Sequence, residues 1–170
     1  MGRREGGGKT GGSPGDDSGP GYDPEAVRRD VEAFGCHLAA LADQHGRVIG
    51  AFTVGLWSGH GHPEIAVFGL ELNQAEDLLD AIQERVEQGE SFAPGSRCED
   101  LLRNYPCEFR AIDPAHLRLF APAVSFHGGT DFSMLQLFWP DRQGRFPWSP
   151  GAREEHRRRQ PRLDLSDLRL

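Results

Sequence analysis

The sequence predicts a single α+β domain, with a mixed or mostly antiparallel sheet of about five strands and helices packed on one face. Some short apolar segments are joined by a tight turn and others are separated by amphipathic helices, so hairpins and crossovers should both occur. A length of 170 residues suits one domain. Gly, Pro, Ser and Arg accumulate at both ends of the chain. We therefore expect a folded domain over residues 22–151, a disordered tail over residues 1–21 and a polar, Arg-rich tail over residues 152–170.

The first predicted elements are a helix and a β-hairpin. Asp23 followed by Pro24 is typical of a helix start, and Gly35 is typical of the residue just after a helix end. Residues 36–42 and 48–55 have strand character and flank a turn.

Three further strands and two further long helices are expected in the rest of the domain. Residues 65–70 form a short apolar run typical of a buried strand. The helix that follows is predicted to begin at Asn73, which has capping-box spacing to Glu76, and to end at Gly89. Residues 90–106 are expected to be irregular, with a short helix near 99–103. The remaining predictions are a strand over 107–112, a helix from Asp113-Pro114 to about 126, and a strand over 133–139.

Charge and cysteine content exclude several classes of function. The net charge is −7, and residues 22–151 carry ten Arg against nineteen acidic side chains. An acidic domain does not suit nucleic-acid or anionic membrane binding, which need a basic surface. The three Cys form no C-x-x-C pair, and neither a signal peptide nor a membrane-spanning apolar run is visible. We therefore expect a cytoplasmic protein with free thiols.

The segment over residues 57–64 is Gly- and His-rich and is expected to be a loop. His60, His62 and Glu64 could supply metal ligands, because imidazole and carboxylate groups suit zinc or iron. The alternative is a loop with solvated or backbone-bonded imidazoles, and the H-x-H-x-E spacing is not that of a dedicated metal motif. We therefore predict no metal and no cofactor. Gly55, just before this loop, indicates either a close approach by a ligand or a strand exit.

A second candidate segment covers residues 136–148. Its aromatic side chains could seal one edge of the sheet or form a pocket wall, with Asp141 and Arg145 as polar groups. The sequence predicts that this segment meets residues 53–64 in one pocket, because apolar walls with a few polar groups are typical of ligand sites. His62, Glu64 and Asp141 are the candidate catalytic residues. The candidate ligand-binding residues are Thr53, Gly55, Trp57, Gln136, Trp139, Arg145 and Trp148.

Both segments carry motifs that resemble a known bacterial family. The stretches F-T-V-G-L-W at residues 52–57, G-H-P-E at 61–64 and V-F-G-L at 67–70 resemble its first signature block. The stretches L-Q-L-F-W-P-D at 135–141 and F-P-W at 146–148 resemble its closing block. The family is the domain of unknown function DUF4262, and the resemblance covers roughly residues 31–151. It implies a small bacterial protein and indicates where a site would lie, and it does not imply an activity.

Two classes of function fit these residues. The first is a pocket for a small molecule, binding or enzymatic, in which Glu64 would act as general base or would orient the ligand, with His62 as its partner. The second is a protein-interaction module, an adaptor or a toxin-neutralising partner, that uses an acidic and aromatic surface. The three Trp side chains discriminate, since burial around a cavity favours the pocket and a flat exposed patch favours the module. The sequence gives neither the partner nor the oligomeric state.

Overall fold

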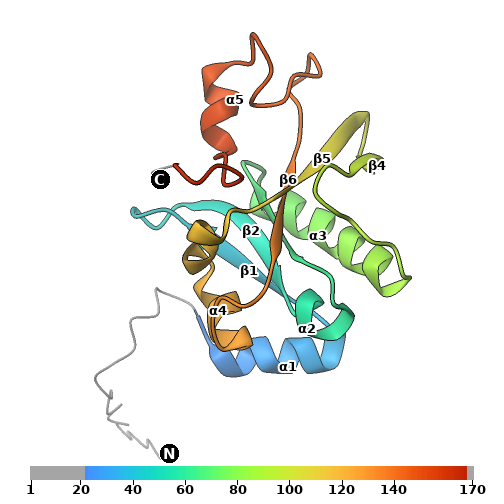
Figure 1. Cartoon of the computed structure of the whole chain (residues 1–170), viewed down its shortest axis with the longest axis vertical. Coiled ribbons are helices and arrows are strands. Elements are labelled where there is room, and N and C mark those ends of the chain that lie inside the picture. The colour runs from blue at the N-terminus through green and yellow to red at the C-terminus, as the bar shows by residue number, and fades with distance from the viewer. Residues whose placement is uncertain (1–21, 168–170) are drawn as a thin grey trace, which may run out of the picture.

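The computed structural model describes residues 22–167 and contains one six-stranded mixed sheet. The predicted disordered tail at residues 1–21 lies outside the described residues. The sheet order is β1-β2-β3-β6-β5-β4, with β3 and β6 parallel and the other neighbouring pairs antiparallel (Figure 1). The strands are β1 (His37–Ala42), β2 (Val48–Val54), β3 (Glu64–Phe68), β4 (Arg97–Leu102), β5 (Tyr105–Ala111) and β6 (Met134–Phe138). The predicted α+β class with a mixed sheet is confirmed.

The sixth strand, β4, occupies a segment that was predicted to be irregular with a short helix. That prediction is wrong, because Cys98 pairs directly with Cys107 across the β4–β5 hairpin. The pairing register shifts between Cys98 and Leu102, and most side chains of β4 are exposed or half-buried. An edge strand of this kind has no regular apolar alternation, so its sequence resembles a loop.

Helices cover both faces of the sheet, whereas the sequence predicts helices on one face only. On one face, α3 (Leu72–Glu87) packs its apolar stripe, including Leu79 and Ile82, against the sheet side chains Ile65 and Val67. On the other face lie α1 (Pro24–Phe34), the 3-10 helix η1 (Pro114–Leu119) and α4 (Ala121–His127). Alternate residues of the central strands therefore feed two separate cores.

The sequence predicts both ends of α1 correctly, but it does not predict the start of α3 or the division of the helix after Asp113. Asp23 caps α1 through a hydrogen bond from the N–H of Glu25, and Gly35 ends it in the left-handed region at φ 81°. Asn73 is not the cap of α3, because that helix already begins at Leu72. The helix predicted from Asp113 is divided in two, with Pro122 at the start of α4. Proline suits the first turn of a helix and not its interior, which accounts for the division.

The segment after residue 151 folds onto the domain, in contrast to the polar tail that the sequence predicts. It contains helix α5 (Glu154–Arg159), and beyond this helix Gln160 and Leu163 are fully buried. In Figure 1, α5 stands at one end of the sheet, and α1, α2 (Leu56–His60) and α4 gather at the opposite end. The sequence conceals this packing because Leu163, the leucine that is fully buried, follows an arginine-rich stretch without helical or strand periodicity. None of the helices described over residues 22–167 is both long enough and apolar enough to cross a membrane.

Candidate functional site

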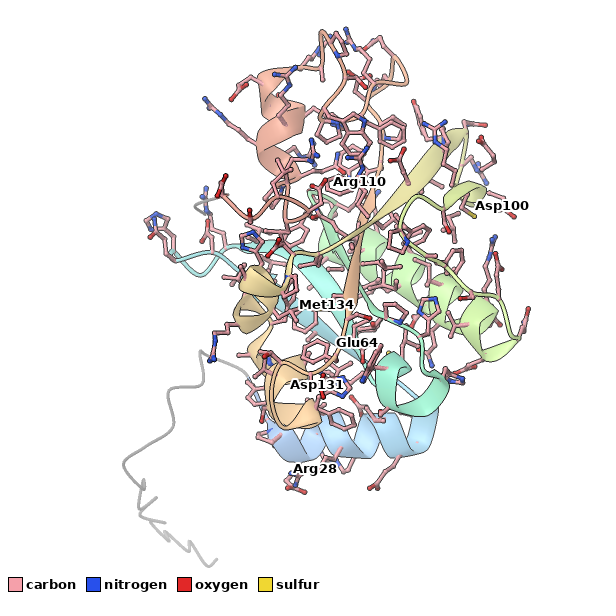
Figure 2. The ribbon with its side chains drawn as sticks, in the orientation of Figure 1. Arg28, Glu64, Asp100, Arg110, Asp131 and Met134 are labelled. Atoms are coloured by element: carbon pink, nitrogen blue, oxygen red, sulfur yellow. The ribbon has the colours of Figure 1, made fainter. Side chains whose placement is uncertain are left out.

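The two predicted site segments lie at opposite ends of the sheet. Glu64 pairs in register with Met134 at the start of the parallel β3–β6 ladder, whereas Asp141 follows the far end of β6. The strand rise of about 3.3 Å per residue puts roughly 13 Å between the two ends of β3 alone. In Figure 2, Glu64 lies beside α2 and α4, and Arg110 lies towards α5 at the other end. The prediction that both segments form one pocket is therefore wrong.

Glu64 is a fully buried carboxylate that the chain itself surrounds with donors. Its oxygens accept hydrogen bonds from the Thr53 hydroxyl at 2.7 Å and from the backbone N–H of Gly55 at 2.7 Å. The Nε2 of His127 lies 2.9 Å from Oε1. Two more backbone N–H groups, those of Leu56 and Trp57 at the start of α2, complete the set. The carboxylate thus holds together β2, β3, α2 and α4, and its oxygens are occupied.

The other predicted residues at this end also bond to their own chain. The Thr53 hydroxyl accepts the N–H of Ile65 while it donates to Glu64. Gly55 has φ 124°, and a Cβ there would lie 2.9 Å from the carbonyl oxygen of Gly35, so the close approach at this glycine is made by the chain and not by a ligand. Trp57 is half-buried beside its bond to Glu64. The predicted loop at residues 57–60 is instead part of the short helix α2.

His62 uses both ring nitrogens within the fold. A backbone N–H can only donate, so the contact of 2.9 Å from the N–H of Phe92 makes Nε2 an acceptor. Nδ1 then carries the proton and donates to the carbonyl of Pro63 at 2.8 Å. Within residues 22–167, no cluster of three or more His, Cys, Asp or Glu side chains could hold a metal. His60, His62 and Glu64 therefore do not converge as metal ligands.

A groove of about 850 Å³ lies at the other end of the sheet. Trp139 and four leucines give it an apolar surface. The indole N–H of Trp139 donates to the carbonyl of Phe68 at 2.8 Å, and the His156 ring meets the indole edge-on with centroids 4.9 Å apart. Its walls come from α3, the β4–β5 turn, residues 139–143 and α5. The apolar lining residues are Leu70, Leu78, Ala81, Leu101, Leu102 and Trp139.

Arginines surround this apolar surface. Arg103, Arg142 and Arg153 line the groove and are exposed. In the part of the chain that the structure describes, none of these three guanidinium groups has a hydrogen bond or an ion pair. By contrast, Asp141 is bound to Arg145, with 2.9 Å between Oδ2 and Nε. The groove therefore presents cationic groups whose hydrogen-bonding capacity is unused.

Titration at the groove follows from these contacts. Partial desolvation tends to raise the pKa of Asp141, but hydrogen bonds from the backbone and guanidinium of Arg145 outweigh it, and the pKa is lowered. Burial lowers the pKa of His156 below its ordinary value, with the nearby Asp141 acting in the opposite direction. At neutral pH, Asp141 is thus charged and His156 is neutral, which leaves the arginines as the cations of the groove.

The remaining predicted residues of the second segment have other surroundings. Gln136 is fully buried and bonds to the backbone at Pro161 and Leu163. Trp148 is stacked on Phe146, with ring centroids 4.9 Å apart, and the Arg110 guanidinium lies 3.6 Å from its ring centroid. Of the sequence-predicted residues, Trp139 and Asp141 line the groove.

Sequence reasoning missed most of the groove. Its cationic lining comes from Arg103, Arg142, Arg153 and Arg159, and none of these is among the predicted site residues. Two features of the sequence could have located the groove: the apolar stripe of α3 and the aromatic residues that follow β6. The contribution of α5 had no local signal, because its segment read as a polar tail.

Comparison with known proteins identifies one family. The model of the family described as "Domain of unknown function (DUF4262)" matches residues 30–153, which is more than half of the chain. Searches of curated proteins and of solved structures give no significant match. The match includes both signature segments and ends just before α5.

Proposed function

Because the chain belongs to the DUF4262 family, whose description assigns no activity, we propose a function from the groove: it binds a small organic anion that has an aromatic or aliphatic part. The apolar part would lie on Trp139 and the leucines, and the carboxylate or phosphate would bond to arginines. The observation that carries this proposal is the combination of an apolar floor with unpaired guanidinium groups around one concavity. Guanidinium groups suit carboxylate and phosphate oxygens, because their N–H donors match the spacing of these oxygens.

Size and composition support a ligand site. Small-molecule pockets commonly occupy about 300–1,000 Å³ and combine apolar walls with a few polar groups. The groove volume of about 850 Å³ falls in that range. The cations also stand out against the domain, because residues 22–151 carry nineteen acids and ten Arg. Four arginines and three acids, Asp77, Asp141 and Glu155, line the groove, so it carries a small positive excess in an acidic protein and would favour an anion over the surrounding surface.

The alternative, a protein-interaction module with an acidic and aromatic surface, has weaker support. Its expected signature is a flat patch of exposed aromatics, yet Trp57, Trp139 and Trp148 are all half-buried. Trp139 contributes to a concave surface. Of the five acidic side chains of α3, Asp77 lines the groove beside Trp139, and the other four lie outside it.

Matched pairs of probes test the proposal. 1-Naphthaleneacetate and 1-naphthaleneacetamide have the same ring system and differ in charge, and phenyl phosphate and benzyl alcohol form a second pair. We expect calorimetry to show that each anion binds at least about tenfold more tightly than its neutral counterpart, a difference of about 1.4 kcal/mol. The anion affinity should fall with added salt because exposed charges are screened.

Two arginine variants localise the binding. Arg142→Ala removes a cation at the groove, whereas Arg118→Ala removes an exposed one on η1, outside it. Only Arg142→Ala should weaken binding of the anionic probes. Equal binding of charged and neutral probes, equal effects of the two variants, or no binding by the wild-type chain would refute the proposal.

A further inference from the structure

The C-terminal segment over residues 154–165 is one wall of the groove. We infer that this segment determines which ligand the groove accepts, and that Gln136 and Gln160 are the positioning residues that hold it in place. The inference rests on the proposed function, since it concerns the same groove. Glu155, His156 and Arg159 of this segment line the groove, as do residues of α3.

Gln160 fastens the segment to the strand-end backbone. Its Oε1 accepts the N–H of Trp139 at 3.0 Å, and its Nε2 donates to the carbonyl of the same residue at 2.8 Å. Nε2 also lies 3.2 Å from Nε2 of His156. One fully buried side chain thus extends the hydrogen bonding of β6 and fixes the ring that packs against the Trp139 indole.

Gln136 makes the reciprocal attachment from the sheet. Its Nε2 donates to the carbonyl of Pro161 at 2.7 Å, and its Oε1 accepts the N–H of Leu163 at 3.3 Å. The carbonyl of Leu163 accepts the N–H of Asp113 at 2.8 Å. Leu163 itself is fully buried in the core beneath η1 and α4. If the segment detached, the Gln136 amide and the Trp139 backbone groups would lose these partners, so docking is favoured.

The chain also fits closely where the segment passes the end of β3. A Cβ at Gly69, which has φ 79°, would lie 2.7 Å from the carbonyl oxygen of Arg159. The Arg159 guanidinium donates to the Gly69 carbonyl and lies 5.6 Å from the Trp139 ring centroid. This wall therefore presents a fixed arginine and imidazole beside the aromatic floor.

The floor of the groove and its C-terminal wall differ in whether the family match covers them. The floor of the groove, including Trp139 and Leu78, lies within the matched residues 30–153, and the wall formed by α5 lies beyond them. The matched region supplies the apolar floor together with Arg103, Arg142 and Arg153, and the added wall brings Glu155, His156 and Arg159 to the groove, where their charges and shape select among anions. Docking of the wall and binding of the ligand must then reinforce each other equally, because linkage between two binding events is reciprocal.

The test uses the full-length chain with Gln160→Ala and, as a matched control, Gln83→Ala. Gln83 also donates to a backbone carbonyl, that of Phe34, but lies outside the groove. Trypsin cleaves after arginine, and Arg157, Arg158 and Arg159 lie in the segment. We expect Gln160→Ala to speed cleavage there and to weaken 1-naphthaleneacetate binding, each by about tenfold, while the far-ultraviolet circular dichroism stays near that of the wild type. Gln83→Ala should change neither.

Reciprocity gives a second readout on the wild-type chain. Saturating 1-naphthaleneacetate should slow cleavage of the segment several-fold, and 1-naphthaleneacetamide should slow it less. If Gln160→Ala speeds cleavage and leaves the affinity unchanged, the segment is a structural strap and the inference is wrong while the proposed function stands. If cleavage is not accelerated, Gln160 does not position the wall. If the wild-type chain binds neither anionic probe, the proposed function fails, and the inference fails with it.

Discussion

Both ends of the sheet have charged side chains beside aromatic residues, but the charged groups are bonded within the chain at one end, and several of those described at the other end are unpaired. Around Glu64, each hydrogen bond of the carboxylate comes from the chain itself, through Thr53, His127 and the start of α2. At the groove, Arg103 and Arg142 face a concavity without partners among the described residues. A buried polar cluster that is internally complete stabilises the fold, whereas charged groups without partners around an apolar hollow can still bind something. The comparison predicts that mutations at the first end affect stability and mutations at the second affect binding.

The largest expected effect is at Glu64. Glu64→Ala removes the acceptor from several buried donors at once, and it should lower the free energy of unfolding by several kcal/mol, because each buried donor left without a partner costs about 1–3 kcal/mol. Urea denaturation measures the change. The matched control is Glu32→Gln on the exposed face of α1, which should stay within about 0.5 kcal/mol of the wild type. A stable Glu64→Ala chain would show that this end is not a structural cluster.

The core under α3 supplies a reference of similar size that involves no charge. Leu79 is fully buried, so Leu79→Ala should cost about 2–5 kcal/mol through lost burial and the cavity left behind. Leu72→Ala, at the partly exposed start of the same helix, should cost much less. Denaturant melts that give equal values for both variants would mean that the apolar face of α3 is misplaced.

A smaller loss of stability is expected from a mutation of His62. This mutation also tests whether His62 is a structural residue or a metal ligand. His62→Ala leaves the N–H of Phe92 without its acceptor, which should cost about 1–3 kcal/mol. Elemental analysis of purified protein should find no stoichiometric zinc or iron in the wild type. His60→Ala, an exposed change, should alter neither result. About one metal per chain that is lost in His62→Ala would reverse the interpretation.

The same contrast explains how much the sequence could predict. Asp23-Pro24 and Gly35 located α1 because capping is a local interaction. The β3 strand was visible because residues 65–68, which follow Glu64, are apolar without interruption. The roles of Glu64 and His62 were not visible, because His127 of α4 and the N–H of Phe92 are far away in the chain. The other donors to Glu64, at residues 53–57, are close in the chain, and the residue types do not show that they turn towards it. A residue in a polar motif has the same identity whether its partner is a ligand or a backbone amide.

The groove shows the second limit of the sequence. Trp139 and Asp141 were identified because large aromatics in a turn-rich segment must pack on something. The wall from α5 was missed because its docking depends on two glutamines and one leucine. Gln136 was predicted to bind a ligand, and it does bind a polar partner, but that partner is the backbone of the chain's own C-terminal segment.

The smallest stability effect should accompany the clearest functional effect, and Arg142 is the residue at which to test this. Its guanidinium is exposed and makes no ion pair within residues 22–167, so Arg142→Ala should change the free energy of unfolding by no more than about 0.5 kcal/mol. The same change removes a cation from the groove and should weaken 1-naphthaleneacetate binding several-fold, with little change for the amide. Glu64→Ala gives the reverse pattern, a large loss of stability with the groove contacts untouched. If Arg142→Ala destabilises the fold and leaves binding unaltered, its charge serves the structure, and the distinction between the two ends of the sheet is lost.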